Sequence, residues 1–263
     1  MLQVSSLTKV FRLASSKRGR EGHDPRERGR RFHAIDGIDF EVRRGQVLGL
    51  LGQNGAGKTT LLRILSTSLK PTSGVVLCDG EDLTKNPLEI RKRIGFVSGN
   101  TGLYGRLTAR EMLIYYGKLH GMAGAALDER IGSLARKLDM DWFLDQRNET
   151  LSSGMRQKVS IARALIHDPE ILLFDELTTG LDVAAADSVL TVVAVCKSEG
   201  RTVLFSTHHM DEVDQLCDSV VIVHEGKLCF EGGVDTMRSQ TGESFLDKAF
   251  LRLIRPKTEG AKT

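Results

Sequence analysis

The sequence has few of the features that distinguish disulfide-bonded and zinc-binding proteins. Its 263 residues include only four cysteines, with no C-x-x-C spacing and no histidine-rich neighbour. Structural zinc sites and disulfide frameworks need such patterns, so we expect reduced and mostly buried thiols. The four are Cys78, Cys196, Cys217 and Cys229.

Long hydrophobic runs are also missing. The apolar stretch at residues 189–196 is far shorter than the ~20 residues that a membrane-spanning helix needs. Residues 1–6 lack the basic start and the apolar segment of a secretory signal. We therefore expect a chain that stays in the cytosol and takes part in membrane processes only through a partner.

The net charge of +3 has a local origin. Residues 14–33 contain seven lysines and arginines against three acidic residues, and glycines and Pro25 interrupt them. This composition predicts a solvated, mobile loop. Contact with anionic lipid headgroups is the alternative interpretation of the same residues. The rest of the chain is close to neutral, so a nucleic-acid partner is not indicated.

Strand-like and helix-like segments alternate along most of the chain. Residues 46–51 are a continuous apolar run, typical of a strand buried on both faces of a parallel sheet. Residues 59–69 then have helical periodicity and end before Pro71. Further strands are expected at 2–10, 34–42, 94–97, 171–174, 202–206 and 219–223, and further helices at 108–120, 127–138, 153–167, 183–197 and 234–254. The alternation predicts an α/β fold with a mostly parallel sheet.

A complete phosphate-loop motif, G-x-x-x-x-G-K-T, occupies residues 52–59 between the expected strand and helix. Its glycines allow successive backbone N–H groups to point at phosphate oxygens, and the helix N-terminus adds partial positive charge. We expect Lys58 to bridge the β- and γ-phosphates of ATP and the Thr59 hydroxyl to ligate Mg²⁺. The expected nucleotide-binding residues here are Gly52, Gln53, Asn54, Gly55, Ala56, Gly57, Lys58, Thr59 and Thr60.

Two carboxylates, Asp175 and Glu176, follow the apolar run at residues 171–174. Ligands bind at the carboxyl ends of parallel strands, so this pair should face the phosphate loop. Asp175 can hold Mg²⁺, and Glu176 can polarise the water that attacks the γ-phosphate. His208, after another expected strand, can donate to the same phosphate. The alternatives are a strand with a polar end and an ordinary surface histidine.

The stretch Leu151-Ser152-Ser153-Gly154-Met155 and the helix after it resemble the signature motif of ABC transporter nucleotide-binding domains. The resemblance covers almost the whole chain. It implies a P-loop NTPase core with a mostly parallel sheet, a small antiparallel β subdomain and an inserted helical subdomain at about residues 101–150. The nucleotide-binding domain would span residues 1–242, and residues 243–263 would form a helical tail.

The resemblance also implies roles for particular residues. In the family two domains pack head to tail, and each ATP lies between one phosphate loop and the other domain's signature. Ser152 and Gly154 would therefore contact a second copy's nucleotide, and Asp182 lies in a segment that resembles the loop crossing that interface. His208 matches the switch histidine, and Phe11 matches the aromatic residue that stacks on adenine.

Several positions depart from the family pattern. They are Gly99 in place of a glutamine that meets Mg²⁺ and the membrane partner, Ser153 and Met155 in the signature, and Leu177 after the acidic pair. Residues 98–104, 106–111 and 241–246 are similar to ATPase subunits of bacterial exporters with a separate membrane permease, above all sodium-efflux systems. The resemblance thus implies a homodimer peripheral to the cytoplasmic face of the membrane, which contacts its integral membrane permease through the helical insertion.

Two other classes of function stay open. A soluble ABC ATPase acting on ribosomes or DNA usually has two nucleotide domains or a long coiled coil, and this sequence has neither. A module that binds ATP without hydrolysing it would fit Gly99 and Ser153 but leaves Glu176 without a role. Small-molecule kinases and GTPases share the phosphate loop, but they leave the signature-like segment unexplained.

Overall fold

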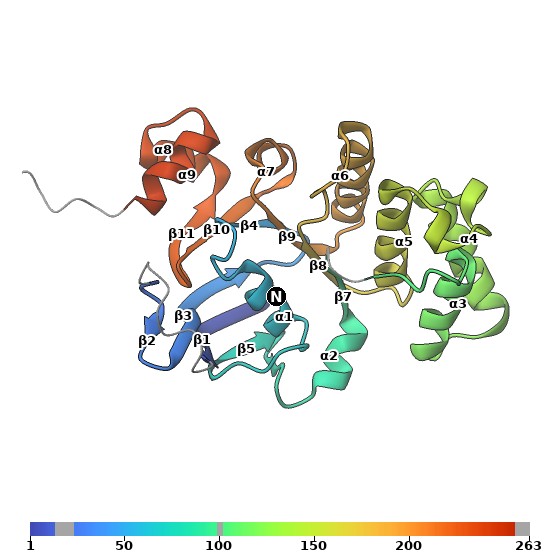
Figure 1. Cartoon of the computed structure of the whole chain (residues 1–263), viewed down its shortest axis with the longest axis horizontal. Helices are drawn as coiled ribbons and strands as arrows, with labels where there is room; N and C mark the ends of the chain where they lie inside the picture. Colours follow the sequence, from blue (N-terminus) through green and yellow to red (C-terminus); the bar gives the residue numbers. More distant parts are fainter. Residues whose placement is uncertain (14–23, 99–101, 256–263) are drawn as a thin grey trace, which may run out of the picture.

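The structure is a computed structural model and describes residues 1–13, 24–98 and 102–255. Its central sheet has six strands in the order β11-β10-β4-β9-β8-β7 (Figure 1). Neighbouring strands are parallel except for the β10–β11 pair. The strands are β4 (Val47–Leu51), β7 (Ile94–Ser98), β8 (Ile171–Asp175), β9 (Thr202–Thr207), β10 (Ser219–His224) and β11 (Lys227–Gly233).

A second, antiparallel sheet is built mainly from the first part of the chain. Its strand order is β2-β3-β1-β5-β6. Its strands are β1 (Leu2–Arg12), β2 (Glu27–Arg28), β3 (Arg31–Val42), β5 (Ser73–Cys78) and β6 (Glu81–Asp82). Helix α1 (Lys58–Leu65) packs with both sheets, because Leu61 and Leu62 share one core cluster with Ile35 of β3 and Leu50 of β4.

The central sheet has two apolar faces because successive side chains of a strand point to opposite sides. On β9, Leu204 packs in the cluster of α1 and the antiparallel sheet, whereas Val203 and Phe205 pack in the cluster that contains α3 to α6. Both faces are buried, and every residue of β4 and β8 is buried as well. The predicted doubly covered parallel sheet is confirmed.

The predicted helical insertion is also confirmed. It contains α3 (Ala109–Leu119) and α4 (Gly124–Lys137), and α5 (Ser153–Leu165) leads back to the central sheet. Thr108 and Glu111 form a reciprocal capping box at the start of α3. Figure 1 shows α3 and α4 at one end of the molecule, far from α8 (Val234–Thr241) and α9 (Leu246–Ile254).

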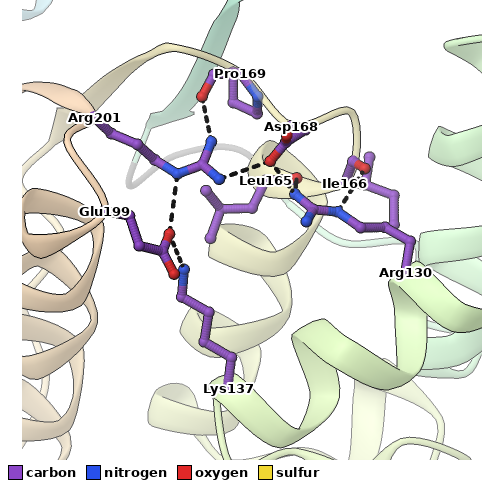
Figure 2. Close-up of polar contacts among 8 residues, drawn as sticks. All are labelled: Arg130, Lys137, Leu165, Ile166, Asp168, Pro169, Glu199 and Arg201. Atoms are coloured by element: carbon purple, nitrogen blue, oxygen red, sulfur yellow. Dashed lines mark hydrogen bonds and ion pairs between the residues drawn. The ribbon is translucent and has the colours of Figure 1, made fainter.

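A polar network joins the insertion to the turns at the amino ends of the core strands (Figure 2). Arg130 of α4 donates to the Leu165 carbonyl and pairs with Asp168 at 2.9 Å. Lys137, about two turns further along the same helix, pairs with Glu199 at 2.6 Å. Arg201 contacts both Asp168 and Glu199, at 2.6 and 3.2 Å. These partly exposed pairs each contribute modestly to stability, but together they fix α4 against the core.

The structure corrects several predicted elements. Residues 24–33 were predicted to be a solvated loop, which is wrong, because β2 and the first part of β3 form a hairpin there. Residues 14–23 lie outside the described residues. The expected helix 59–69 ends at Leu65, since Thr67 has a φ of 59°. The expected tail helix 234–254 is interrupted by Gly242, whose φ is 69°, and becomes α8 and α9.

Several elements were missed, among them β5, β6, β11 and two short helices. Strand β11 follows β10 through Glu225 and Gly226, both at positive φ, and this is the geometry of a tight two-residue hairpin. Helices α2 (Pro87–Arg93) and α7 (Met210–Leu216) have only seven residues each, too few for a clear periodicity. Among the described residues no helix has both the length and the apolarity to cross a membrane.

Candidate nucleotide site

The phosphate loop connects β4 to α1. At two of its positions the surrounding backbone leaves room only for glycine. Gly52 would bring a Cβ within 2.3 Å of the Val223 carbonyl oxygen. Gly57, with a φ of 120°, would bring one within 2.7 Å of the Ala34 carbonyl oxygen. The loop is therefore closely packed between β3 and β10, and the N-terminus of α1 opens onto it. Such a loop and helix start are a ready anion-binding site.

Lys58 is the first residue of α1 and is only 4% exposed. Its Nζ donates to the carbonyl oxygen of Gly52 at 2.6 Å and to that of Gln53 at 3.3 Å. The same ammonium lies 3.3 Å from Oε1 of Glu176. The loop's single lysine thus places its charge inside the loop and next to the acidic pair.

The acidic pair lies at the carboxyl end of β8, as the sequence predicts. Asp175 is 5% exposed, and its Oδ1 accepts a hydrogen bond from the Ser206 hydroxyl at 2.7 Å. The amide of Glu176 donates to Ser206 of the same neighbouring strand. Glu176 has a φ of 51°, a left-handed conformation that costs free energy in a non-glycine residue and that folded proteins often retain at functional sites.

His208 follows β9 and lies near the same carboxylate as the lysine. Its Nδ1 is 4.0 Å from Oε1 of Glu176, and its side chain is exposed. One carboxylate oxygen thus has a buried ammonium and an imidazole as neighbours. The structure brings these three residues together from the start of α1 and from the ends of β8 and β9.

A buried carboxylate that sequence reasoning missed supports this cluster. Glu212 of α7 is 5% exposed and accepts hydrogen bonds from the hydroxyls of Thr178 and Thr207. Thr207 also accepts from the amide of His209 at 3.0 Å. These bonds hold the segment after Glu176 against the end of β9. No sequence signal distinguishes Glu212 from the other acidic residues of its short helix, because its partner Thr178 is 34 positions away.

The remaining predicted residues lie on other elements. Ser152 caps α5 by accepting from the amide of Met155 at 3.2 Å, and Asp182 caps α6 (Val183–Ser198) by accepting from that of Ala185 at 2.9 Å. A Cβ on Gly154 would lie 2.9 Å from the Cβ of Ala185, so α5 and α6 approach closely there. Among the described residues no hydrogen bond or ion pair joins Ser152, Gly154 or Asp182 to the phosphate loop.

Phe11 lies at the end of β1 and is 39% exposed, with its register partner Phe32 on β3. Gly99 and Asn100 lie outside the described residues. Ser98 just before them is buried and is the register partner of Asp175, so β7 also ends beside the acidic pair.

Comparison with known proteins shows the family to which this chain belongs. The family described as "ABC transporter" matches residues 35–179, more than half of the chain. The chain belongs to the ABC transporter family. It is the ATP-binding subunit of such a transporter, and it hydrolyses ATP for transport.

Individual relatives agree with this assignment. The ABC transporter ATP-binding protein NatA of Bacillus subtilis (strain 168) is 42% identical over 224 residues, which cover 84% of this ABC subunit and 91% of the relative. A solved ATP-binding subunit of an ABC transporter has 28% identity and a TM-score of 0.80, with 97% of this chain and all of that chain covered. The dimeric bacterial ABC transporter cassette MJ0796 has 26% identity and a TM-score of 0.75, with 89% and 99% covered.

Proposed function

We propose that this ABC subunit is the motor of a bacterial-type exporter and that its cargo is the sodium ion. The observation that supports a motor is the cluster of Lys58, Glu176 and His208 beside the phosphate loop. The proposal of sodium export depends on the resemblance of residues 98–104, 106–111 and 241–246 to sodium-efflux ATPases. The cargo itself would be selected by the membrane partner.

In this proposal Glu176 is the residue that polarises the attacking water. Its backbone is left-handed and donates from its amide to Ser206, and its carboxylate lies 3.3 Å from Nζ of Lys58. A positioned carboxylate within reach of the γ-phosphate can accept the water's proton as the water attacks. Lys58 would neutralise charge on the phosphates, and His208 would donate to the γ-phosphate.

Mg²⁺ is the expected companion of ATP. The Thr59 hydroxyl and the Asp175 carboxylate offer hard oxygen ligands of the kind that Mg²⁺ prefers, with the nucleotide's phosphates and water completing its shell. Among the described residues no group of three or more His, Cys, Asp or Glu could hold a metal. The donors therefore fit a nucleotide-bound ion, which would neutralise phosphate charge. Asp175 is held for this role by its bond from Ser206.

The proposed catalytic unit is a homodimer. Ser152, Gly154 and Asp182 gather at the neighbouring N-termini of α5 and α6, where Ser152 and Asp182 are exposed. A helix N-terminus binds phosphate well, but this one belongs to no phosphate site within its own chain. ABC cassettes dimerise, as MJ0796 does. A second copy would supply this surface to the nucleotide, while Phe11 stacks on the adenine.

The membrane subunit is proposed to dock between the helical insertion and the core. A cavity of about 240 Å³ lies there, and its lining includes Phe96 of β7, Tyr116 of α3, His120 just after α3 and Arg163 of α5. Docking at this position would place the subunit peripherally at the cytoplasmic face of the membrane. The proposal includes no nucleic-acid partner.

Transport assays with the copurified membrane subunit test the proposal. The complex would be reconstituted in vesicles with the ATPase subunits outside and a sodium-sensitive dye inside. Mg-ATP should cause sodium uptake, and the Glu176→Gln complex should not. Hydrolysis without sodium uptake would contradict the proposal that sodium is the cargo. Failure to copurify with any membrane protein would contradict the proposal that the chain belongs to an exporter. ATP binding without hydrolysis, even in the complex, would favour the non-hydrolysing module.

A further inference from the structure

The segment of residues 24–33, here called the basic hairpin, is an extension of the antiparallel sheet that reaches the phosphate loop. The amide of His33 donates to the carbonyl of Arg26 at 3.0 Å, and that of Leu13 donates to the carbonyl of Arg30 at 3.0 Å. The hairpin is thus bonded to β3 and to the end of β1. Its position next to the nucleotide site is fixed by backbone bonds.

Arg26 is the residue of the basic hairpin that contacts the loop. Its Nη1 donates to the carbonyl oxygen of Gly55. Its Nε and Nη2 donate to the two carboxylate oxygens of Asp24 at 2.9 and 2.7 Å, and its guanidinium carbon lies 4.6 Å from the centre of the Phe32 ring. The side chain is only 16% exposed. A bidentate acid pair and an aromatic ring therefore hold the guanidinium in one orientation.

The carbonyl that Arg26 holds belongs to an otherwise open part of the loop. Gly55 has a φ of 81°, and a Cβ built on it would meet nothing within 4 Å. The next amide, that of Ala56, donates to the Gln53 carbonyl at 3.0 Å. The peptide unit between Gly55 and Ala56 is thus fixed at both ends. Without Arg26 this carbonyl would lose that hydrogen bond at a glycine, where a peptide can rotate at little cost.

We infer that Arg26 is a positioning residue that holds the Gly55–Ala56 peptide so that the loop keeps its phosphate-binding shape. This inference goes beyond the proposed motor and needs only its nucleotide site. The carbonyl of Gly55 stays turned toward the basic hairpin, and the N–H groups of the neighbouring loop residues stay available to a triphosphate. Preorganisation of this kind raises affinity because the loop is already ordered before the ligand arrives, so binding does not have to order it.

The test compares Arg26→Gln with Arg26→Lys and with the control Arg28→Gln. Arg28 lies on the same hairpin but pairs with Asp36 at 2.6 Å instead of with the loop. Displacement of a fluorescent ATP analogue from the isolated subunit would measure the affinities for ATP and for inorganic tripolyphosphate. Arg26→Gln should bind both about tenfold more weakly, because a charge-assisted hydrogen bond is lost. Arg26→Lys should recover most of this loss, and Arg28→Gln should stay within about twofold of the parent.

Tripolyphosphate separates positioning from direct contact with the nucleoside, since it has no base or ribose. A loss for ATP alone would mean that Arg26 contacts the nucleoside and would overturn the inference. Unchanged affinities in Arg26→Gln would overturn it as well. Hydrogen exchange adds an independent measurement, because amides of residues 53–57 should exchange faster in Arg26→Gln while those of β4 do not. Failure of sodium transport leaves all these outcomes unaffected, so the two proposals can fail separately.

Discussion

The N-termini of α1 and α5 are both predicted to bind phosphate, yet they have very different surroundings. At α1, Oε1 of Glu176 lies 3.3 Å from Nζ of Lys58 and 4.0 Å from Nδ1 of His208, and Arg26 anchors the loop from outside. At α5, Ser152 is exposed, and among the described residues its side chain makes only the capping hydrogen bond. The first site can bind within one chain, whereas the second needs a phosphate from elsewhere.

The largest expected effect comes from Glu176→Gln. The amide cannot accept the water's proton, so ATP hydrolysis should fall at least about 100-fold. ATP affinity should stay within about threefold because the phosphate loop is unchanged, and the ATP-bound dimer should accumulate in size-exclusion chromatography. Glu149→Gln, an exposed residue far along the chain from the acidic pair, serves as the control. Full turnover in Glu176→Gln would remove the assigned role.

Ser152→Asp tests the other helix terminus. Aspartate caps helices as well as serine does, so α5 should stay folded, but its negative charge would repel the phosphates of a second copy's nucleotide. We expect ATP-dependent dimerisation and turnover to fall about tenfold or more, with ATP affinity of the monomer unchanged. Ser152→Asn, a neutral cap, should retain most of the activity. A normal dimer in Ser152→Asp would show that α5 faces no phosphate.

Thr178→Val should affect stability. It removes the hydroxyl that donates to buried Glu212 at 2.6 Å and leaves that carboxylate with one donor fewer. The free energy of unfolding, measured by urea denaturation, should fall by about 1–3 kcal/mol. Thr179→Val, at an exposed neighbour, should change it little. Equal effects of the two substitutions would contradict a supporting role for the buried network.

The smallest effect concerns His167, which lies in the cleft between α3 and the core. It belongs to neither of the two helix N-termini compared above. Its ring stacks on His120 with centroids 3.8 Å apart, and burial lowers the pKa of His167 to about 4. The unfolded chain, with a histidine pKa of ~6.5, therefore binds more protons below that pH. The stability from neutral His167 is complete above pH ~6.5 and is lost as the pH falls toward about 4.

Substitution His167→Asn should therefore flatten the dependence of urea unfolding on pH between about 7 and 5. Burial lowers the pKa of His120 as well, so His120→Asn should act in the same direction. ATP affinity should be unchanged in both variants. An unaltered pH slope would show that His167 is accessible to protons in the folded chain.

Most of the α1 site could be predicted from the sequence because its geometry is local. A buried strand, a glycine loop and a helix start lie within residues 46–65. The glycines in the sequence indicate where the loop backbone has no room for a side chain. Asp175 and Glu176 could be predicted for a similar reason, since the ends of parallel strands meet at one edge. Charge and glycine content misled the interpretation of the basic hairpin, where backbone pairing with β3 overrides composition.

Sequence alone thus determined which groups are proposed for the chemistry of this ABC subunit: a lysine, a hydroxyl and two carboxylates at fixed places after apolar strands. Only the tertiary structure decided which distant groups support them. Arg26 and Gly55 are 29 positions apart, and Thr178 and Glu212 are 34 apart. A motif records a backbone shape that neighbouring residues form together, whereas a hydrogen bond between remote side chains exists only after the sheets and helices have packed.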